Sequence, residues 1–453
     1  MEVFGSSGVR GVVGEDLTPT FVLRVATAAG TVWEAERAAV ARDTRHTGGM
    51  LADAAAAGLA RVGSDVDRLG VVPTPAAQLY AERSGIPVVV ITASHNPPEY
   101  NGVKLVGNDG IELSIAALER IEGRLAGAAA GARWDAVGER RTVEGVGRRY
   151  IEAVCGAVDR ERIADAALTV ALDPGHGAGA LTSPELLREL GCRVLTVNAH
   201  PDGHFPGRDP EPVPEHLGDL RRLVRTSEAD LGVAHDGDAD RAIFVDERGE
   251  YIEGDATFAA LAAAELGRGD TVVSAVTASQ RLVDLTERVG ATLERIPVGS
   301  TRIISRVREL DAAGESVPIA GEGNGGVLFP AYRLARDGAY AAARFLELVA
   351  ERPASEVVGR FAGYHNVRTT VGYEDDAERA AILAAAERHA ASSSGELDAT
   401  DGYRLDFGDA WVLARASGTE PLVRVYAEAR EKARAGGLAE EMRAALEAGR
   451  DEE

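Results

Sequence analysis

The sequence alternates short β-branched runs with alanine-rich helical stretches, and this alternation starts afresh three times along the chain. Its first appearance has strand-like runs at 38–41, 69–72 and 88–91 and helical patterns at 50–62 and 76–83. Strands that alternate with helices form layered α/β domains, in which helices connect the strands of one sheet. The first part of the chain is therefore predicted to fold as an α/β domain.

The same alternation returns after the charged stretch at 139–141 and again from 271 onward. The second set has strand-like runs at 168–173, 193–197 and 231–235 and a helical pattern at 184–190. The third set has strand-like runs at 271–275, 293–296 and 319–321 and a helical pattern at 282–289. Two further α/β domains are therefore predicted.

The C-terminal part has a different pattern. Helical stretches at 377–391 and 433–448 accompany runs at 403–407, 411–414 and 422–429 that are typical of antiparallel strands. This pattern predicts a smaller α+β domain. With 453 residues and roughly 100–150 residues per domain, three or four domains are expected, and we place them at 1–145, 146–248, 249–352 and 353–453.

The charge of the chain is strongly acidic. It has 49 basic and 72 acidic residues, a net charge of −23, and its only lysines are Lys104 and Lys432. Such a surface repels nucleic-acid phosphates over a Debye length, so nucleic acid is not expected as a partner. The composition is similar to that of proteins adapted to high salt, and we expect a halophilic source.

Cysteine use and hydropathy indicate the compartment. Cys155 and Cys192 lie in apolar surroundings without CxxC spacing, which favours buried thiols over a disulfide or a zinc site. No apolar stretch approaches the roughly 18 residues of a membrane span, and no signal peptide opens the sequence. A soluble, cytoplasmic protein is therefore expected.

A serine follows the apolar run at 88–91, in the segment 92–98 with the sequence TASHNPP. The two prolines fix their own φ and disfavour helical geometry in the preceding residue, so Ser94 is expected in a rigid, non-helical turn. His95 and Lys104 could supply hydrogen bonds and positive charge to a phosphate on this serine. Ser94 is a candidate phosphate carrier; an ordinary polar turn is the alternative.

Three aspartates alternate with small residues in the segment 236–241, which has the sequence DGDADR. Carboxylates so close together repel one another unless a cation lies between them. Asp236, Asp238 and Asp240 are therefore candidate ligands of a hard, oxygen-preferring ion such as Mg²⁺. Arg241 could hold a phosphate that is shared with the metal.

Two other interpretations of this acidic segment are open to test. An EF-hand is suggested by Glu247 at the twelfth position from Asp236, but the sixth position, where an EF-hand needs glycine, is Arg241. The flanks also have strand-like rather than helical patterns. A solvated acidic turn without metal is the second alternative.

A glycine-rich segment, GEGNGG at 321–326, follows the last strand-like run of the third set. Glycines let a ligand approach the backbone, and Glu322 and Asn324 can accept from and donate to vicinal hydroxyls. This indicates a polyol site, with a flexible glycine loop as the alternative. A dinucleotide fingerprint does not fit, because no helix clearly opens after the glycines and Pro330 follows closely.

A fourth segment, RASGTEP at 415–421, lies between two strand-like runs. Small polar residues around a glycine can form an anion-binding nest of backbone amides. Arg415 and Arg424 would complete a phosphate cradle through charge-assisted hydrogen bonds. A plain hairpin loop is the alternative. Together, the four segments indicate phosphoryl exchange with a phosphosugar, in which one site transfers a phosphate and the other holds a second one.

The motifs and their order resemble those of the α-D-phosphohexomutase superfamily, which includes phosphoglucomutase, phosphomannomutase and phosphoglucosamine mutase. The resemblance runs nearly end to end and is carried by the segments 4–11, 42–45, 92–104, 236–241, 321–326, 336–338 and 415–424. It implies an α/β fold of four domains around a central cleft. Three would be α/β domains with mixed sheets, and the last an α+β domain related to the TATA-box-binding-protein fold.

The resemblance also implies a role for each candidate residue. One Mg²⁺ would be bound by the phosphoserine and the three aspartates: Ser94, Asp236, Asp238 and Asp240. Sugar hydroxyls would be held by Glu322 and Asn324. The phosphate that is not transferring would be bound by Arg415, Ser417, Gly418, Thr419 and Arg424. The reacting end would be lined by Arg10, His95, Lys104 and Arg241.

In the implied mechanism, phosphoserine donates its phosphoryl group to the free hydroxyl of a hexose 1- or 6-phosphate. The resulting hexose 1,6-bisphosphate turns around and returns its other phosphate to Ser94. Phosphoserine adds about −1.5 to −2 charge beside three carboxylates, so a divalent cation is needed. A general base must take the hydroxyl proton. Lys104 is our candidate, with a simple counter-charge to phosphate as the alternative.

One departure from the family bears on the substrate. Many hexomutases that use glucose or mannose phosphates have Ser-Gly-His where this chain has Asn324, Gly325 and Gly326. The ending found here is similar to that of archaeal phosphoglucosamine mutases, so glucosamine phosphate is the predicted substrate, with mannose and glucose phosphates as alternatives. Gly323 replaces a side chain that is often present and leaves the contact to the sugar 2-substituent undefined.

Two rival functions belong to other classes. A phosphosugar phosphatase could use the same metal site, but it would need no second phosphate cradle. A non-catalytic sugar-phosphate-binding homologue could lose its nucleophile, whereas Ser94 and the three aspartates are present here. The expected partner is therefore a small phosphosugar, and the expected assembly a monomer or a homodimer.

Overall fold

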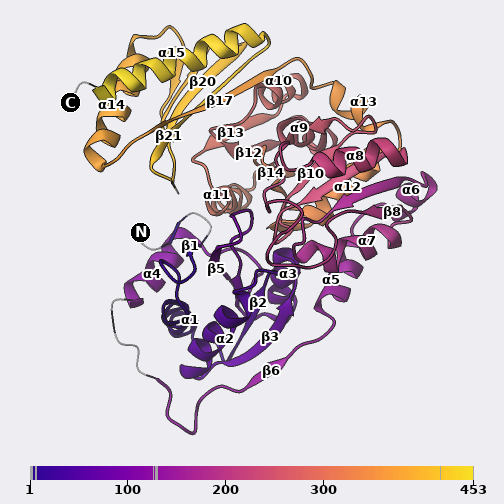
Figure 1. Ribbon diagram of the computed structural model, residues 1–453, viewed down its shortest axis with the longest axis vertical. Coiled ribbons are helices and arrows are strands. Elements are labelled where there is room, and N and C mark those ends of the chain that lie inside the picture. The colour runs from indigo at the N-terminus through magenta and orange to yellow at the C-terminus, as the bar shows by residue number, and fades with distance from the viewer. Residues whose placement is uncertain (1–3, 6–7, 126, 128–130, 419, 452–453) are drawn as a thin grey trace. The chain divides into compact units, whose positions relative to one another are not determined.

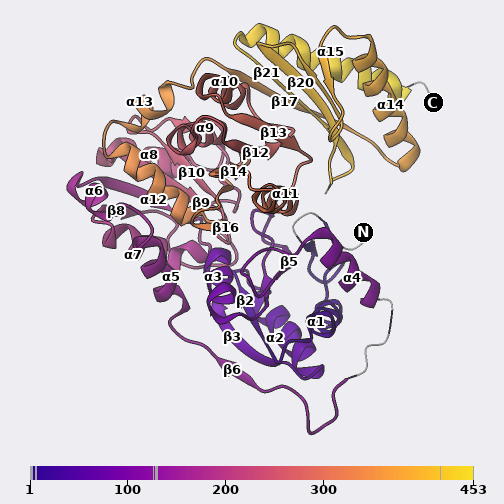
Figure 2. The same ribbon diagram turned by 180° about the vertical axis from the view of Figure 1, so that it is seen from behind.

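The computed structural model describes residues 4–5, 8–125, 127, 131–418 and 420–451. The chain divides into two compact units. Unit 1 comprises Met1–Thr257 and Asn324–Val357, and unit 2 comprises Phe258–Gly323 and Val358–Glu453. Figures 1 and 2 show the elements from opposite sides.

The N-terminal part of unit 1 is built on a six-stranded mixed sheet with the order β1-β5-β4-β2-β3-β6. The strands are β1 (Val9–Val12), β2 (Arg37–Arg42), β3 (Asp65–Val71), β4 (Val88–Ile91), β5 (Tyr100–Val106) and β6 (Arg140–Thr142). The helices are α1 (Pro19–Trp33), α2 (Gly48–Arg61), α3 (Thr74–Ser84) and α4 (Ile115–Leu125). β3 and β4 run parallel to β2, whereas β5 runs antiparallel to β4.

Alternating strand residues form the core of this sheet. Ala38 and Val40 on β2 share one buried apolar cluster with Val89 and Ile91 on β4 and with side chains of α1, α2 and α4. This is the period of two expected when one face of a strand meets a layer of helices. Close packing of α1 on α2 depends on Gly58, where a Cβ would lie 2.4 Å from a backbone oxygen of α1.

The second sheet of unit 1 has the order β11-β10-β9-β7-β8. Its strands are β7 (Thr169–Asp173), β8 (Arg193–Thr196), β9 (Leu231–His235), β10 (Ala242–Val245) and β11 (Tyr251–Ile252). The accompanying helices are α5 (Val146–Cys155), α6 (Arg160–Asp165), the 3₁₀ helix η1 (Ala178–Leu181), α7 (Ser183–Glu189) and α8 (Gly218–Ser227). The acidic segment 236–241 connects β9 to antiparallel β10, so strands and not EF-hand helices flank it.

The third α/β region contributes to both units. Unit 1 contains the antiparallel pair β15 (Val327–Phe329) and β16 (Arg333–Arg336), followed by α12 (Gly338–Val349). In unit 2, β12 (Thr271–Ala275) pairs in parallel with β13 (Thr292–Ile296) and β14 (Ile319–Gly321), with α10 (Gln280–Val289) and α11 (Ser300–Ala312). The chain passes between the units three times: within α9 (Gly254–Glu265), between Gly323 and Asn324, and within α13 (Ala354–Gly359).

The C-terminal part of unit 2 is an antiparallel sheet with the order β17-β21-β20-β19-β18. Its strands are β17 (His365–Gly372), β18 (Glu396–Asp398), β19 (Tyr403–Asp406), β20 (Ala410–Ala416) and β21 (Leu422–Ala429). α14 (Asp376–Ser392) and α15 (Lys432–Asp451) lie along one face of the sheet (Figures 1 and 2). Alternate residues of β20 and β21, such as Val412 and Val425, pack beneath them in one core.

The predicted fold class is confirmed: α/β domains with mixed sheets precede a C-terminal domain with an antiparallel sheet. Cys155 and Cys192 are both free thiols; Cys192 is buried as predicted, whereas Cys155 is only half-buried. None of the helices in the described part of the chain combines the length and the apolar character that a membrane span requires.

Candidate active site

Ser94 lies in the turn that follows β4, and its side chain is fully buried. Its φ of 52° is in the left-handed region, which residues other than glycine rarely adopt. The turn holds this conformation, because the Ser94 N–H donates to Thr92 Oγ1 at 2.9 Å and the Asn96 N–H donates to the Ala93 carbonyl at 3.1 Å. The serine is therefore held in a fixed, non-helical turn.

Arg45, which follows β2, holds this turn in place through hydrogen bonds to its backbone carbonyl groups. Its guanidinium donates to the carbonyl oxygens of Ser94, Asn96, Pro97 and Tyr100 at 2.6–3.0 Å. Its Nε donates to a carboxylate oxygen of Asp43 at 3.1 Å. Arg45 is completely buried, so these bonds replace the water that a guanidinium would otherwise bind.

The three predicted aspartates cluster after β9. Asp236, Asp238 and Asp240 are all buried, and one carboxylate oxygen from each lies within 4.8 Å of the others. Among the described residues, Asp238 Oδ1 and Asp240 Oδ1 have no hydrogen-bond partner. Buried carboxylate oxygens without a partner are costly, so the cluster fits a hard divalent cation.

The serine turn and the aspartate cluster meet directly. The Ser94 hydroxyl donates to Asp236 Oδ2 at 2.5 Å, although the two residues are 142 positions apart in sequence. Gly237 makes this approach possible, because a Cβ at this position would lie 2.6 Å from the Ser94 carbonyl oxygen. The structure thus brings together the predicted phosphate carrier and the predicted metal ligands.

The contact at Gly237 leads to a testable prediction. In Gly237→Ala the added methyl group pushes the Ser94 turn away from the aspartates, and kcat is expected to fall about 10²-fold, the cost of a misplacement of roughly 1 Å. Overpacking should also lower stability by about 1–3 kcal/mol. Steady-state kinetics and thermal unfolding measure the two effects. Gly218→Ala is the matched control, because a Cβ there meets nothing within 4 Å, and it should keep wild-type kinetics. Equal activity of the two variants would show that the Ser94 turn does not need this spacing.

Cations surround the aspartates. The ammonium of Lys104 lies 3.1 Å from Asp240 Oδ2 and 3.1 Å from Glu112 Oε1. Arg336 donates to Asp240 Oδ2 at 2.6 Å, and Arg241 Nε lies 3.8 Å from Asp236 Oδ2. Positively and negatively charged side chains therefore lie close together in the buried site.

These neighbours shift several pKa values. Burial, with the adjacent charges of Asp238 and Asp240, raises the pKa of Asp236 above its ordinary value. Burial alone would lower the pKa of Lys104, but the surrounding carboxylates outweigh it and raise that pKa to about 12. The positive charge of Arg241, with burial, lowers the pKa of His95 far below its usual range.

The remaining residues predicted for the reacting end also lie in unit 1. Arg10 on β1 donates to Asn96 Oδ1 at 3.0 Å and therefore lies against the same turn as Ser94. Burial, followed by the charge of Arg241, lowers the pKa of Arg10. His95 is partly buried and neutral at physiological pH, so it can offer a neutral imidazole to a phosphate.

The two predicted sugar-binding residues belong to different units. Glu322 is buried in unit 2, directly after β14. Asn324 is exposed in unit 1, and its Oδ1 accepts a hydrogen bond from the Gly326 N–H at 3.0 Å. Gly325 has a φ of +88°, and a Cβ there would lie 2.6 Å from the Ala242 carbonyl. The loop ending therefore needs glycine at 325.

The predicted phosphate loop connects β20 to β21 in unit 2. Arg415 and Arg424 are directly opposite each other in the antiparallel register of these strands. Arg415 Nε donates to Asp401 Oδ2 at 3.1 Å, and Arg424 forms an ion pair with Glu420. Two cations directly opposite on a sheet destabilise it unless anions lie nearby. Asp401 and Glu420 supply these anions within the domain.

The tip of this loop is only partly described. The Ser417 N–H donates to the Leu422 carbonyl at 2.9 Å, and the Ser417 side chain is largely buried. Gly418 is exposed, and a Cβ on it would meet nothing within 4 Å. Thr419 lies outside the described residues.

Four residues of the site were not predicted from sequence. Thr74 donates through Oγ1 to Asp238 Oδ2 at 2.6 Å. Arg208 donates to the His235 carbonyl at 2.6 Å and so braces the end of β9. Arg336 contacts Asp240 as described above, and Arg45 holds the Ser94 turn. Arg45 and Arg336 lie within segments that carry the family resemblance, so the sequence could have pointed to them. Thr74 and Arg208 lie outside these segments, and the sequence gives no indication of their role.

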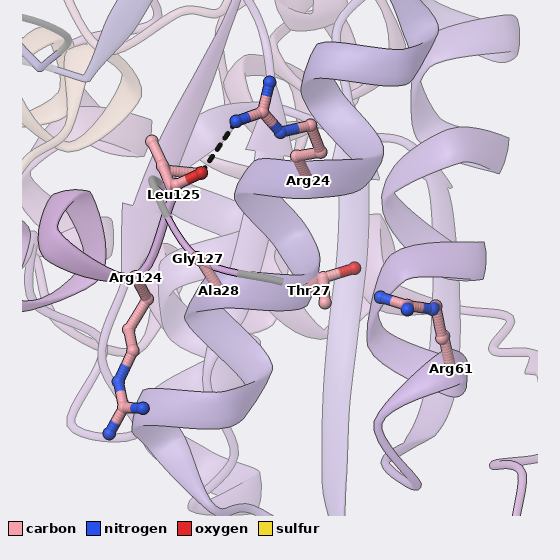
Figure 3. A pocket seen from close by; sticks show the side chains of 7 residues that line it. All are labelled: Arg24, Thr27, Ala28, Arg61, Arg124, Leu125 and Gly127. Atoms are coloured by element: carbon pink, nitrogen blue, oxygen red, sulfur yellow. Dashed lines mark hydrogen bonds between the residues drawn. The ribbon is translucent and has the colours of Figure 1, made fainter. Parts of the chain in front are cut away.

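A separate cavity of about 160 Å³ lies away from these residues, between α1, α2 and the end of α4. Figure 3 shows Arg24, Arg61 and Arg124 around it, with Arg24 donating to the Leu125 carbonyl at 2.6 Å. The three guanidinium groups point in different directions rather than toward one point. The cavity contains none of the predicted site residues.

The chain matches four sequence profiles described as Phosphoglucomutase/phosphomannomutase: alpha/beta/alpha domain I over residues 1–131, domain II over 148–249, domain III over 253–364 and the C-terminal domain over 366–445. A protein of Thermococcus kodakarensis named phosphoglucomutase/phosphomannomutase is 42% identical over 446 residues, 96% of each chain. A probable phosphoglucosamine mutase of Methanopyrus kandleri is 39% identical over 444 residues, 97% of this chain and 96% of that one. The crystal structure of a phosphoglucomutase/phosphomannomutase family protein from Burkholderia thailandensis superimposes with a TM-score of 0.86 at 27% identity, covering 99% of this chain and 97% of that one.

Proposed function

Because this chain belongs to the phosphoglucomutase/phosphomannomutase family of phosphohexomutases, we propose that it interconverts hexosamine 6-phosphate and hexosamine 1-phosphate through a phosphate carried on Ser94. The family membership makes the chain an intramolecular phosphotransferase. The substrate, the mechanism and the residue roles are our proposal. The observation that carries it is the 2.5 Å contact between Ser94 Oγ and Asp236 Oδ2, which joins a serine in the left-handed region to a cluster of candidate metal ligands.

The aspartate cluster supports Mg²⁺ as the cofactor. Asp236, Asp238 and Asp240 supply only oxygen ligands, which Mg²⁺ prefers, and two of their buried oxygens accept no hydrogen bond from a described residue. A phosphate oxygen on Ser94 would complete the ligand set. When bound, Mg²⁺ would neutralise negative charge on the phosphoryl group during transfer.

In the transfer step, the bond between phosphorus and Ser94 Oγ breaks and a new bond forms to the free sugar hydroxyl, whose proton is released to a base. The return step reverses this order at the other phosphate of hexose 1,6-bisphosphate, with Ser94 as the acceptor. Arg10, His95 and Arg241 are proposed to contact the phosphoryl oxygens, because hydrogen-bond donors and positive charges stabilise the developing charge.

Of the two roles predicted for Lys104, the counter-charge role is the better supported. A general base must be deprotonated, and the carboxylates around Lys104 raise its pKa to about 12. The ammonium is instead held between Asp240 and Glu112. We therefore prefer the role of a counter-charge to the phosphate on Ser94 for Lys104, and another group would serve as the base.

The second phosphate is proposed to bind the loop between β20 and β21. Arg415 and Arg424 lie opposite each other there, so two guanidinium groups are available on neighbouring strands to bind one phosphate. The backbone amides near Ser417 and Gly418 would add neutral donors. A phosphatase needs no such second site, so the mutase is favoured over it.

The substrate is proposed to be glucosamine phosphate, recognised by Glu322 and Asn324. The relative in Methanopyrus kandleri is called a probable phosphoglucosamine mutase, which supports this choice. The 42% identical relative in Thermococcus kodakarensis is named for glucose and mannose phosphates, and these are the second candidates. The same site and the same mechanism would serve all three sugars.

A comparison of substrates tests this proposal. Wild-type protein with Mg²⁺ and a trace of hexose 1,6-bisphosphate is expected to prefer glucosamine phosphate in kcat/KM by at least about tenfold, or about 1.4 kcal/mol. Asn324→Ala should reduce this preference, whereas Asn108→Ala, a matched change on the exposed surface, should retain it. Equal kcat/KM for the three sugars would replace glucosamine phosphate by a broad hexose specificity. Stoichiometric release of inorganic phosphate would instead indicate a phosphatase.

A further inference from the structure

Asp401 lies in the turn between β18 and β19, beside the proposed phosphate loop. Its Oδ2 accepts two hydrogen bonds within unit 2, from Arg415 Nε at 3.1 Å and from the Val298 N–H at 3.0 Å. Both side chains of the ion pair are largely buried, with 26% of Asp401 and 13% of Arg415 exposed. Partial burial makes this pair stronger than an ordinary surface ion pair.

Gly402 allows the turn to lie this close to β20. It has a φ of +90°, and a Cβ at this position would lie 2.2 Å from the Ala414 carbonyl oxygen and 2.8 Å from Arg415 Cβ. Any side chain would therefore push the turn away from the strand. Asp401 owes its contact with Arg415 to the glycine that follows it.

The contact constrains a side chain that would otherwise be mobile. A free arginine side chain samples many rotamers, and binding a phosphate with such a side chain loses part of this entropy. Asp401 engages the Nε edge of the guanidinium, whereas a phosphate binds two N–H groups in the fork geometry of arginine. A side chain that is ordered in advance loses less entropy when the ligand arrives.

The contact between Asp401 and Arg415 also reduces the repulsion between Arg415 and Arg424. Arg415 and Arg424 face each other across β20 and β21, and without anions this pair is unfavourable. Asp401 pairs with Arg415, and Glu420 pairs with Arg424. Each arginine is thereby fixed by its own carboxylate before a ligand binds.

We propose that Asp401 is a positioning residue, which orients Arg415 toward the phosphate that is not being transferred. The proposal rests on the proposed function, because Arg415 is expected to bind this phosphate only if the protein is a phosphohexomutase with a second phosphate site. Asp401 touches no substrate and acts through Arg415. The bond to Val298 also ties the loop before α11 to the same carboxylate.

A double-mutant cycle tests this proposal in the full-length protein. Asp401→Asn retains an oxygen for the Val298 N–H but loses the charge that orients Arg415, and kcat/KM for the hexose phosphate is expected to fall about tenfold. Arg415→Ala should lower kcat/KM about 10²-fold. In the Arg415→Ala background, Asp401→Asn should change kcat/KM less than about twofold, because the residue through which it acts is gone.

The controls separate this role from a purely structural one. Asp398→Asn removes a carboxylate at the end of β18, next to this turn, one that accepts the Thr400 N–H at 2.9 Å, and should leave kcat/KM unchanged. Hydrolysis of the phosphate on Ser94 to water needs no second phosphate site and should proceed at the wild-type rate in Asp401→Asn.

Any other outcome would contradict either the role of Asp401 or the proposed function on which it rests. Additive effects in the cycle or an unchanged kcat/KM in Asp401→Asn would show that Asp401 does not position Arg415. Failure of this variant to fold would assign Asp401 a structural role in place of the proposed one. Absence of mutase turnover in the wild-type protein would overturn the proposed function instead, so the two failures are distinguishable.

Discussion

Replacing Ser94 with alanine is expected to lower kcat at least about 10⁴-fold, because the proposed reaction passes through a phosphate on the serine oxygen and alanine cannot carry one. The groups proposed to bind the substrate are unchanged, so hexose phosphate should still bind with an affinity close to that of the wild type. A coupled mutase assay measures turnover, and calorimetric titration measures binding. Radiolabelled phosphate from hexose 1,6-bisphosphate should label the wild-type protein and not the variant.

Ser64→Ala is a matched control for this experiment. Ser64 is also a buried serine, and its hydroxyl donates a single hydrogen bond, to the Ala35 carbonyl at 2.7 Å. Each variant loses one buried hydrogen bond, worth about 1 kcal/mol for the neutral carbonyl partner of Ser64 and about 1.5–3 kcal/mol for the carboxylate partner of Ser94, so thermal unfolding should shift more in Ser94→Ala. Only Ser94→Ala should lose turnover. Wild-type turnover in that variant would rule out the covalent mechanism.

Loss of the metal is expected to have the second-largest effect. Treatment with a chelator should abolish turnover, and added Mg²⁺ should restore it. Asp238→Asn, which removes one charge from the cluster, is expected to lower kcat about 10²- to 10³-fold. Mg²⁺ at a hundred times its Kd should stabilise the wild-type protein by about 2.7 kcal/mol, and this stabilisation should be much smaller in the variant. Thermal unfolding with and without Mg²⁺ measures it.

Asp246→Asn is the matched control for the metal experiment. Asp246 is a buried aspartate at the end of β10, and its Oδ1 accepts the N–H groups of Arg248 and Glu250 at 3.0 and 2.8 Å. This variant should lose some stability but keep both turnover and the response to Mg²⁺. If Asp238→Asn retained the full response, the aspartate cluster would not be the metal site.

The parts of the site that could be predicted from sequence are those encoded in short contiguous segments. Asp236, Asp238 and Asp240 follow an apolar run and alternate with small residues, so their convergence needs only one tight loop. Ser94 likewise follows a buried strand and precedes two prolines. In both cases, local backbone chemistry determines where the side chains lie.

The parts that could not be predicted depend on contacts between distant segments. Thr74 and Asp238 are 164 positions apart, and Arg336 and Asp240 are 96 apart. A threonine at a helix start is usually a cap, and one more arginine among many carries no signal by itself. Only the packing of separate elements selects these side chains.

Some elements were missed for a similar reason. β17 (His365–Gly372) is an edge strand with mostly polar residues, and only Val371 in it is fully buried. An edge strand gains its hydrogen bonds from a neighbour, here β21, and needs no continuous apolar pattern. β3 extends from Asp65, before the predicted run at 69–72; three of its first four residues are charged, so this part has no apolar run to indicate a strand.

The bracing of the Ser94 turn by Arg45 has a consequence for how such an enzyme can diverge. All five N–H groups of that guanidinium are engaged, by Asp43 and by four carbonyls of the turn, so no other residue type could replace it. Related sequences that keep the serine turn are therefore expected to keep Arg45 as well. The segment 321–326, to which we assign sugar binding in the proposed function, lies outside that network, so substitutions that change the sugar are expected there. The phosphoryl-transfer step at Ser94 would then stay the same while the preferred sugar changed.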